Sequence, residues 1–100
     1  MTPEAFHQVL TLAEAGPPQD GQGPDAGLRE LPAKSTLAIY LSSNAVGLTI
    51  AGVEAIAVDG PLARARTTKG DLYLFAVVDV FAVNVEGRAH PKAQRRAGFG

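Results

Sequence analysis

The stretch LYLFAVVDVFAVNV, residues 72–85, decides how this chain folds. It is the densest run of β-branched and aromatic residues, and its side chains alternate with a period of two, which indicates sheet. One unbroken strand here would run about 45 Å, far beyond the usual ~20 Å. It would also place the Asp79 carboxylate on the same face as Phe75, where burial is costly. We therefore expect two strands, residues 71–76 and 80–86, joined by a tight bend or helical turn that exposes Asp79.

The residues upstream of this stretch continue the same alternation. Gly52 interrupts it and predicts a bulge or bend, so the residues after it form either a separate strand or the second half of a bent one. Turn-forming residues separate the alternating segments. Strands are predicted at residues 35–42, 46–51, 53–58 and 62–67, with turns at residues 42–44, 59–61 and 68–71.

An N-terminal helix precedes the strands. Thr2 is suited to cap it, Pro3 suits its first turn, and Phe6 and Leu10 belong to an apolar stripe along one face. Gly16 ends the helix, and a Gly/Pro-rich linker follows it. The helix then either covers the strands as a lid or swings free. Within the linker we expect one helical turn at residues 28–31.

Taken together, these segments predict a mainly β fold, a five-stranded SH3-like barrel preceded by an α-helix. Short antiparallel strands with a strongly bent member close most readily into a small barrel. The expected organisation is an N-terminal helix at residues 1–16, a linker at 17–34, the barrel at 35–87 and a basic tail at 88–100.

Composition narrows the function classes. The chain has no cysteine, which excludes disulfide scaffolds, zinc ribbons and thiol nucleophiles and fits a cytoplasmic location. The apolar run at residues 45–58 is too short for a membrane span and contains Glu54, so no membrane is expected. Charge is uneven, because residues 1–34 sum to −3, residues 35–87 to −2 and residues 88–100 to +4. A separated basic end is typical of an interaction tail.

Catalytic motifs are missing from the sequence. It has no phosphate-binding glycine loop followed by a lysine, no nucleophile elbow, no zinc-protease motif and no calcium loop. The carboxylates are scattered singly, and His7 is best explained as an edge or solvated side chain beside the helix stripe. We therefore predict a protein that is not an enzyme and that has no metal or cofactor.

Basic residues are the candidate functional groups. Arg64 and Arg66 project from the same strand face, a spacing at which two guanidinium groups can hold adjacent phosphates or carboxylates. The alternative is an exposed face that neutralises Glu54 or Glu86. The predicted nucleic-acid contacts are Arg64, Arg66, Lys69 and Tyr73 in the strands and Arg88, Lys92, Arg95 and Arg96 in the tail.

Three local features occur in order along the predicted strands. They are the alternation Leu37-x-Ile39-x-Leu41 before Asn44, the later Gly52 and Asp59, and the run Tyr73-Leu74-Phe75-Ala76-Val77 before Val80. Together they resemble the Sm-like barrel, the fold of Sm proteins and the bacterial RNA chaperones related to them. Leu74 and Phe75 stand where the chaperone branch has a lysine and a histidine. The resemblance covers residues 37–86. It implies rings built by pairing the last two strands between subunits, with nucleic acid at the ring face or rim.

The sequence thus predicts a non-catalytic, oligomeric small β-barrel that binds RNA or single-stranded DNA. A second hypothesis is a protein-interaction or assembly module whose strand edges pair with a partner chain and which binds no nucleic acid. A third is a subunit or lid for an enzyme whose chemistry lies on another chain.

Overall fold

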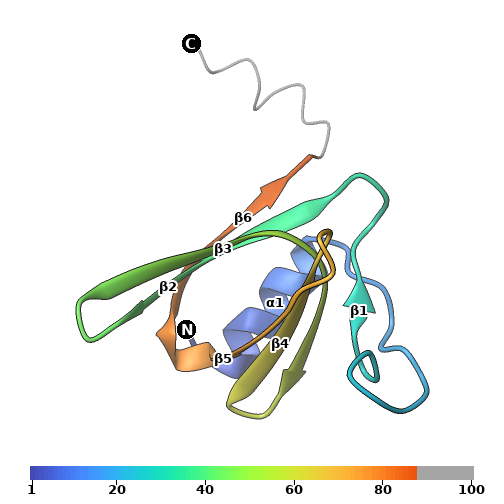
Figure 1. Ribbon diagram of the computed structural model, residues 1–100, viewed down its shortest axis with the longest axis horizontal. Helices are drawn as coiled ribbons and strands as arrows, with labels where there is room; N and C mark the ends of the chain where they lie inside the picture. The colour runs from blue at the N-terminus through green and yellow to red at the C-terminus, as the bar shows by residue number, and fades with distance from the viewer. Residues whose placement is uncertain (88–100) are drawn as a thin grey trace.

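The computed structural model describes residues 1–87 as a mainly β fold with one N-terminal helix and an open antiparallel sheet (Figure 1). Helix α1 spans Pro3–Leu12, and the 3-10 helix η1 spans Val77–Asp79. The strands are β1 (Arg29–Glu30), β2 (Thr36–Ser43), β3 (Val46–Asp59), β4 (Leu62–Thr67), β5 (Leu72–Ala76) and β6 (Val80–Glu86). The prediction of a mainly β chain behind an N-terminal helix is confirmed.

The strands lie in the order β5-β4-β3-β2-β6, and the short β1 pairs with β3 away from this path. All of these pairings are antiparallel. β5 and β6 stand at the two ends of the order, and no pairing joins them within residues 1–87. The sheet is therefore open, and both terminal strands keep one unpaired edge.

The C-terminal stretch forms two strands joined by a helical turn, as predicted. β5 ends at Ala76, η1 forms a single 3-10 turn, and β6 starts at Val80. Val77 in this turn is fully buried, and its N–H donates to the Pro61 carbonyl at 2.9 Å. The buried valine anchors the corner, while Asp79 stays partly exposed.

Gly52 bends β3 into two halves. Its φ of +70° lies in the left-handed region that only glycine adopts readily. The register to β2 shifts there, because Leu37 and Ile39 pair with Val53 and Ile50, which leaves an extra residue on β3. The first half of β3 pairs with β2, whereas the second half pairs with β4. Residues 53–58 are thus the second half of a bent strand.

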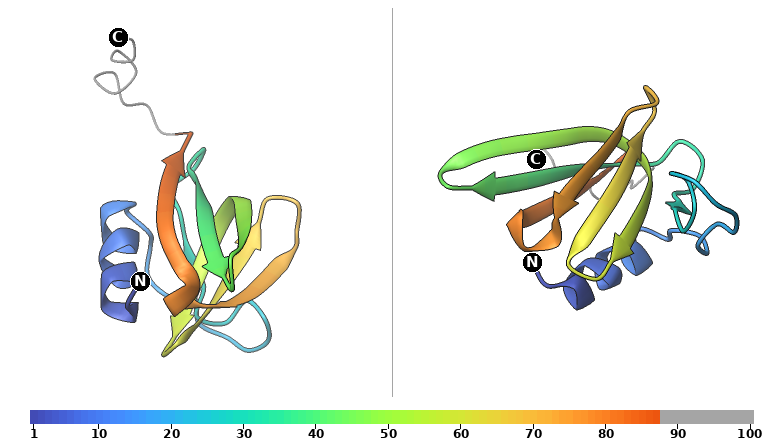
Figure 2. Two further views of the ribbon diagram at one scale, coloured as in Figure 1. Left: turned by 90° about the vertical axis from the view of Figure 1, so that its left-hand side faces the viewer. Right: turned by 60° about the horizontal axis from the view of Figure 1, so that its bottom comes forward.

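Helix α1 lies against one face of the sheet as a lid (Figure 2). Phe6 and Leu10 are fully buried in the main core cluster, together with Ile39 from β2. The ring of Phe6 meets the ring of Phe75 edge-on, with centroids 6.4 Å apart. Thr2 caps the helix by accepting the Ala5 N–H at 3.1 Å, as its sequence predicted.

The linker is more ordered than its composition suggested. The helical turn expected at residues 28–31 is wrong, because Arg29 and Glu30 form β1 and pair with Ile56 and Ala55. Leu28 is fully buried and packs with two small residues of β3, Ala55 and Ala57, in a second core cluster. Because the alanine side chains are small, Leu28 can pack directly on the outer face of β3. This packing holds the C-terminal end of the linker against the sheet.

Candidate functional site

Arg64 and Arg66 project from the outer face of β4, as their spacing predicted. The residues that alternate with them, Ala63, Ala65 and Thr67, are buried on the opposite face. Across the outer face, the partners of the two arginines on β3 are Ala57 and Ala55. The guanidinium groups therefore extend over small residues towards the linker.

Arg66 binds three carboxylates at once. Its nitrogens lie 2.6 Å from Glu30 Oε2, 2.8 Å from Glu54 Oε2 and 3.3 Å from Asp25 Oδ1. The hydrogen bond to Glu30 is the largest influence raising the pKa of Arg66 above its ordinary value; those to Glu54 and Asp25 also raise it, against burial, which lowers it. The guanidinium thus ties β1, the bent strand β3 and the linker to β4.

The Arg64 side chain binds backbone carbonyls of the linker. Its Nη2 donates to the Ala26 carbonyl at 2.7 Å and its Nη1 to the Pro24 carbonyl at 3.0 Å. Its Nε donates to Asp59 Oδ2 at 2.9 Å, next to the turn that precedes β4. Arg64 therefore fastens the linker to the sheet without presenting a free charge.

These contacts bear on the two interpretations of the arginine pair. Glu54 neutralises Arg66, as the second interpretation expected, whereas Glu86 contacts neither arginine. Four carboxylates meet two guanidinium groups here, so the cluster is net negative. A phosphate would have to displace intramolecular partners from both arginines. The role of Arg64 and Arg66 in nucleic-acid binding stays a prediction, and this geometry does not favour it.

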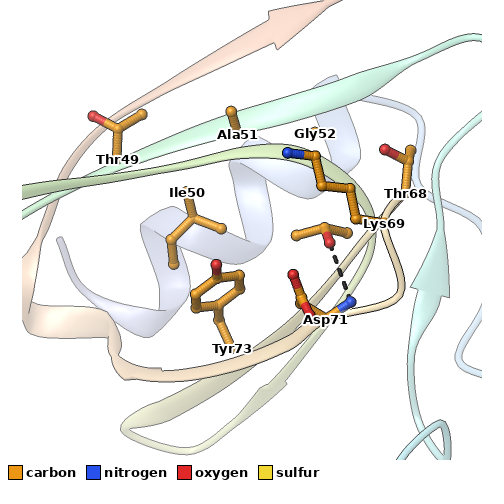
Figure 3. Close-up of a pocket in the computed structure, with 9 residues that line it drawn as sticks. Thr49, Ile50, Ala51, Gly52, Thr68, Lys69, Asp71 and Tyr73 are labelled. Atoms are coloured by element: carbon orange, nitrogen blue, oxygen red, sulfur yellow. Dashed lines mark hydrogen bonds between the residues drawn. The ribbon is translucent and has the colours of Figure 1, made fainter.

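Lys69 and Tyr73, in contrast, come together in one hollow of about 270 Å³ between the bend of β3 and the β4–β5 turn (Figure 3). Tyr73 is 41% exposed, and its ring lies beside Ile50. The Lys69 side chain extends over the bend towards Gly52, and no hydrogen bond or ion pair engages it within residues 1–87. Asp71 also lines this hollow. The site offers a free cation, a carboxylate and an aromatic surface.

A second hollow of about 330 Å³ lies nearer the β2–β3 turn and is mostly apolar. It is formed by side chains from β2, β3, β5 and η1, and Ser43 and Asp79 supply its polar rim. Leu48 and Leu74 in this hollow are 56% and 71% exposed. Its lining is Leu41, Ser43, Val46, Leu48, Leu74, Phe75, Ala76 and Asp79.

The sequence did not reveal this exposed apolar surface. Alternation places Val46 and Leu48 on the inward face of β3, opposite Ser43 and Leu41 of β2. The β2–β3 hairpin extends beyond the part of the sheet that α1 covers, so the inward face is left uncovered there (Figures 1 and 2). The sequence signals this only by placing a short helix ahead of a long hairpin, because the helix is then too short to cover the whole inward face.

Other candidate features lie elsewhere or outside the described part. The predicted tail contacts Arg88, Lys92, Arg95 and Arg96 fall beyond residue 87 and are not described.

Among residues 1–87, no three His, Asp or Glu side chains are placed to hold a metal ion. None of the helices in this part has the length and apolar character needed to cross a membrane. His7 lines an open hollow on the outer side of α1, beside Thr11 and the exposed Leu12.

Comparisons with known proteins give no relative. No family model, curated protein or solved structure matches this chain.

Proposed function

We propose that this protein is a non-catalytic small β-barrel module that binds other proteins through the open edges of its sheet. The observation that carries this proposal is the set of exposed apolar side chains on the strands whose edges are unpaired. Leu74 on β5 and Phe81 on β6 are both largely exposed, and each strand has one free edge within residues 1–87. Exposed apolar strands with free edges are the usual sites at which a partner strand adds.

The strand order supports the small-barrel and Sm-like interpretation. The order β5-β4-β3-β2-β6, the bend at Gly52 and the 3-10 turn between β5 and β6 agree with the resemblance at residues 37–86. Self-association is one form of the proposed function, in which β5 of one copy pairs with β6 of the next. Such head-to-tail contacts close into a ring when the rotation between copies permits it.

Strand-edge variants test the proposal. The full chain is cross-linked in extract from its own cells after nuclease treatment, and its solution mass is measured by light scattering. Leu74→Lys and Phe81→Lys are expected to abolish the cross-linked protein species or the oligomer. Leu12→Lys, on the outer side of α1, is the matched control, since Leu12 is 79% exposed. Monomers without any protein partner would contradict the proposal, as would equal loss in the control.

Nucleic-acid binding remains a second candidate function, favoured by the meeting of Lys69 and Tyr73 in one hollow. A base stacked on the exposed tyrosine ring would place a neighbouring phosphate near the free lysine. The acidic surroundings of Arg64 and Arg66 oppose this candidate, whereas the basic tail supports it. Titration of labelled single-stranded RNA at low salt tests it, and no binding would exclude it.

A further inference from the structure

Two hollows follow one another between the first half of β3 and β5. The first lies beside an edge of β3, and the second lies over the inward face of β3 and beside an edge of β5. Residues 49–52, which are consecutive in β3, line one of them, and residues 74–76, consecutive in β5, line the other. Neighbouring residues of a strand point to opposite faces, so a hollow that touches consecutive residues follows the strand's edge. We call the two hollows together the edge cleft. β3 and β5 diverge along it from the β4–β5 turn towards the β2–β3 turn (Figures 1 and 2).

Within residues 1–87, no strand pairs with the edge of β3 that faces this cleft before Val53. Residues 46–50 of β3 pair with β2 along the opposite edge, and β4 joins the near edge only from Val53 onwards. The last contact before the free segment is the Thr68 N–H, which donates to the Gly52 carbonyl at 2.9 Å. The free edge, residues 46–51, is about 20 Å long at roughly 3.3 Å per residue. Its unpaired N–H and C=O groups match an extended peptide of about six residues.

The side chains around the cleft define which peptide fits. Leu48 and Leu74 expose apolar surface at its hairpin end. Lys69 stands at the end near the bend, and Asp79 stands at the other end. Neither charge has a hydrogen-bond or ion-pair partner among residues 1–87. The cleft thus combines a backbone template with an apolar hollow and opposite charges at its two ends.

We infer that the edge cleft binds an extended peptide segment of a partner protein, which adds as a strand to the free edge of β3. Apolar side chains at alternate peptide positions occupy the hollow between Leu48 and Leu74. An acidic side chain or terminal carboxylate pairs with Lys69, and a basic group pairs with Asp79. This inference rests on the proposed function. Of the three unpaired edges within residues 1–87, those of β5, β6 and the first half of β3, it assigns the partner to β3. Pairing between copies through β5 and β6 would leave the edge of β3 empty.

A displayed library of random decapeptides, panned against the full chain, tests the inference. The enriched peptides are synthesised with a fluorophore, and their affinity is measured by anisotropy. They are expected to share apolar residues at every second position, flanked by an acid on one side and a base on the other. Methylation of single peptide nitrogens should weaken binding at alternate positions only, because a strand adds through every second residue. A uniform effect of methylation would contradict strand addition.

Two matched pairs of variants locate the binding site. Leu48→Asp is expected to weaken binding by about tenfold or more, whereas Leu62→Asp should leave it unchanged, since Leu62 is equally exposed at 56% but lies outside the cleft. Lys69→Glu should shift the selected peptides from an acidic to a basic flank, and Lys34→Glu should not. Circular dichroism confirms that each variant is folded.

The outcomes separate this inference from the proposed function. A cross-linked protein partner lost in Leu74→Lys and Phe81→Lys but bound equally well by Leu48→Asp would overturn the edge cleft and keep the proposed function. A library that yields no enriched peptide would also overturn it. Single-stranded RNA that binds the full chain and is weakened by Leu48→Asp and Lys69→Glu would assign the cleft to nucleic acid instead.

Discussion

The guanidinium of Arg66 and the carboxylate of Glu30 lie 2.6 Å apart because both residues pair with Ala55, from opposite edges of β3. β1 and β4 are therefore bridged over a strand that separates them. Ala55 is fully buried, and its methyl group is short enough for both side chains to meet above it. Leu28 packs on the same residue. This ion pair, together with Leu28, attaches the linker to the sheet.

Breaking this bridge should destabilise the fold. Arg66→Ala leaves Glu30, Glu54 and Asp25 without their shared partner, and we expect the free energy of unfolding to fall by about 1–2 kcal/mol. Glu30→Gln should cost less, because two carboxylates remain on Arg66. Urea unfolding of both single variants and of the double variant gives the coupling energy. Strictly additive losses would show that Arg66 and Glu30 do not act together.

The same bridge should not respond to pH near neutrality. Its carboxylates raise the pKa of Arg66 above the ordinary value, so the guanidinium's contribution to stability is complete below that ordinary value. The contribution is lost only when the pH rises through the raised value, under strongly alkaline conditions. The stability difference between the native chain and Arg66→Ala is therefore expected to stay constant from neutral to moderately alkaline pH. A difference that falls within that range would contradict this assignment.

Leu28 should contribute more to the stability of the fold than a linker residue usually does. Leu28→Ala removes the side chain that covers Ala55 and Ala57 and is expected to cost about 2–5 kcal/mol. It should also make the linker more accessible to proteases, since the arginine contacts and the short β1–β3 pairing would then hold it without the buried leucine. Leu62→Ala is the control, because Leu62 is exposed and should change stability by less than about 0.5 kcal/mol. Equal effects of the two variants would show that the second core cluster is not needed.

The strands were predictable because their information is local. Alternation at residues 72–86, the glycine at the bend and the turn residues each depend on neighbours in the chain. The corner at η1 followed from the cost of burying Asp79 in one long strand. These local patterns agree with the structure because the alternation that identifies a strand also decides which of its faces is buried in the core.

The partners of the arginines were not predictable in full. The pair itself was visible as i and i+2 on a strand, and Glu54 was expected as a partner. Asp25 and Glu30 lie in a Gly/Pro-rich segment without periodicity, and their positions depend on the pairing of β1 with β3. A two-residue strand carries too little pattern to be recognised from the sequence. The arrangement that satisfies the arginines therefore depends on long-range contacts.

Substitution of Gly52 tests the bend that shapes the edge cleft. Gly52→Ala forces a side chain into a φ of +70° and is expected to cost about 1–2 kcal/mol. The added Cβ would lie 3.4 Å from Thr68 Oγ1, an ordinary contact, so strain is the main cause. Gly47→Ala, in the same strand without a positive φ, should be neutral or slightly stabilising. Thermal unfolding measures both, and a neutral Gly52→Ala would show that the bend relaxes.

Helix α1 should be part of the cooperative fold. Phe6→Ala removes a fully buried ring that meets Phe75, and we expect a loss of about 3–5 kcal/mol. Leu12→Ala, on the exposed side of the same helix, should change stability by less than about 0.5 kcal/mol. Chemical denaturation followed by circular dichroism separates the two. A small loss for Phe6→Ala would show that the sheet folds without its helix.

If the chain binds single-stranded nucleic acid, the salt dependence of the affinity distinguishes Lys69 from the arginine pair Arg64 and Arg66. Each lysine or arginine that contacts a phosphate steepens the plot of log affinity against log salt by about 0.7. Lys69→Ala should reduce the slope by about that amount, because its ammonium has no partner within residues 1–87. Arg64→Gln and Arg66→Gln should leave the slope unchanged, since their donors are held by carboxylates and linker carbonyls. A smaller slope in either arginine variant would mean that the linker moves aside to admit a phosphate.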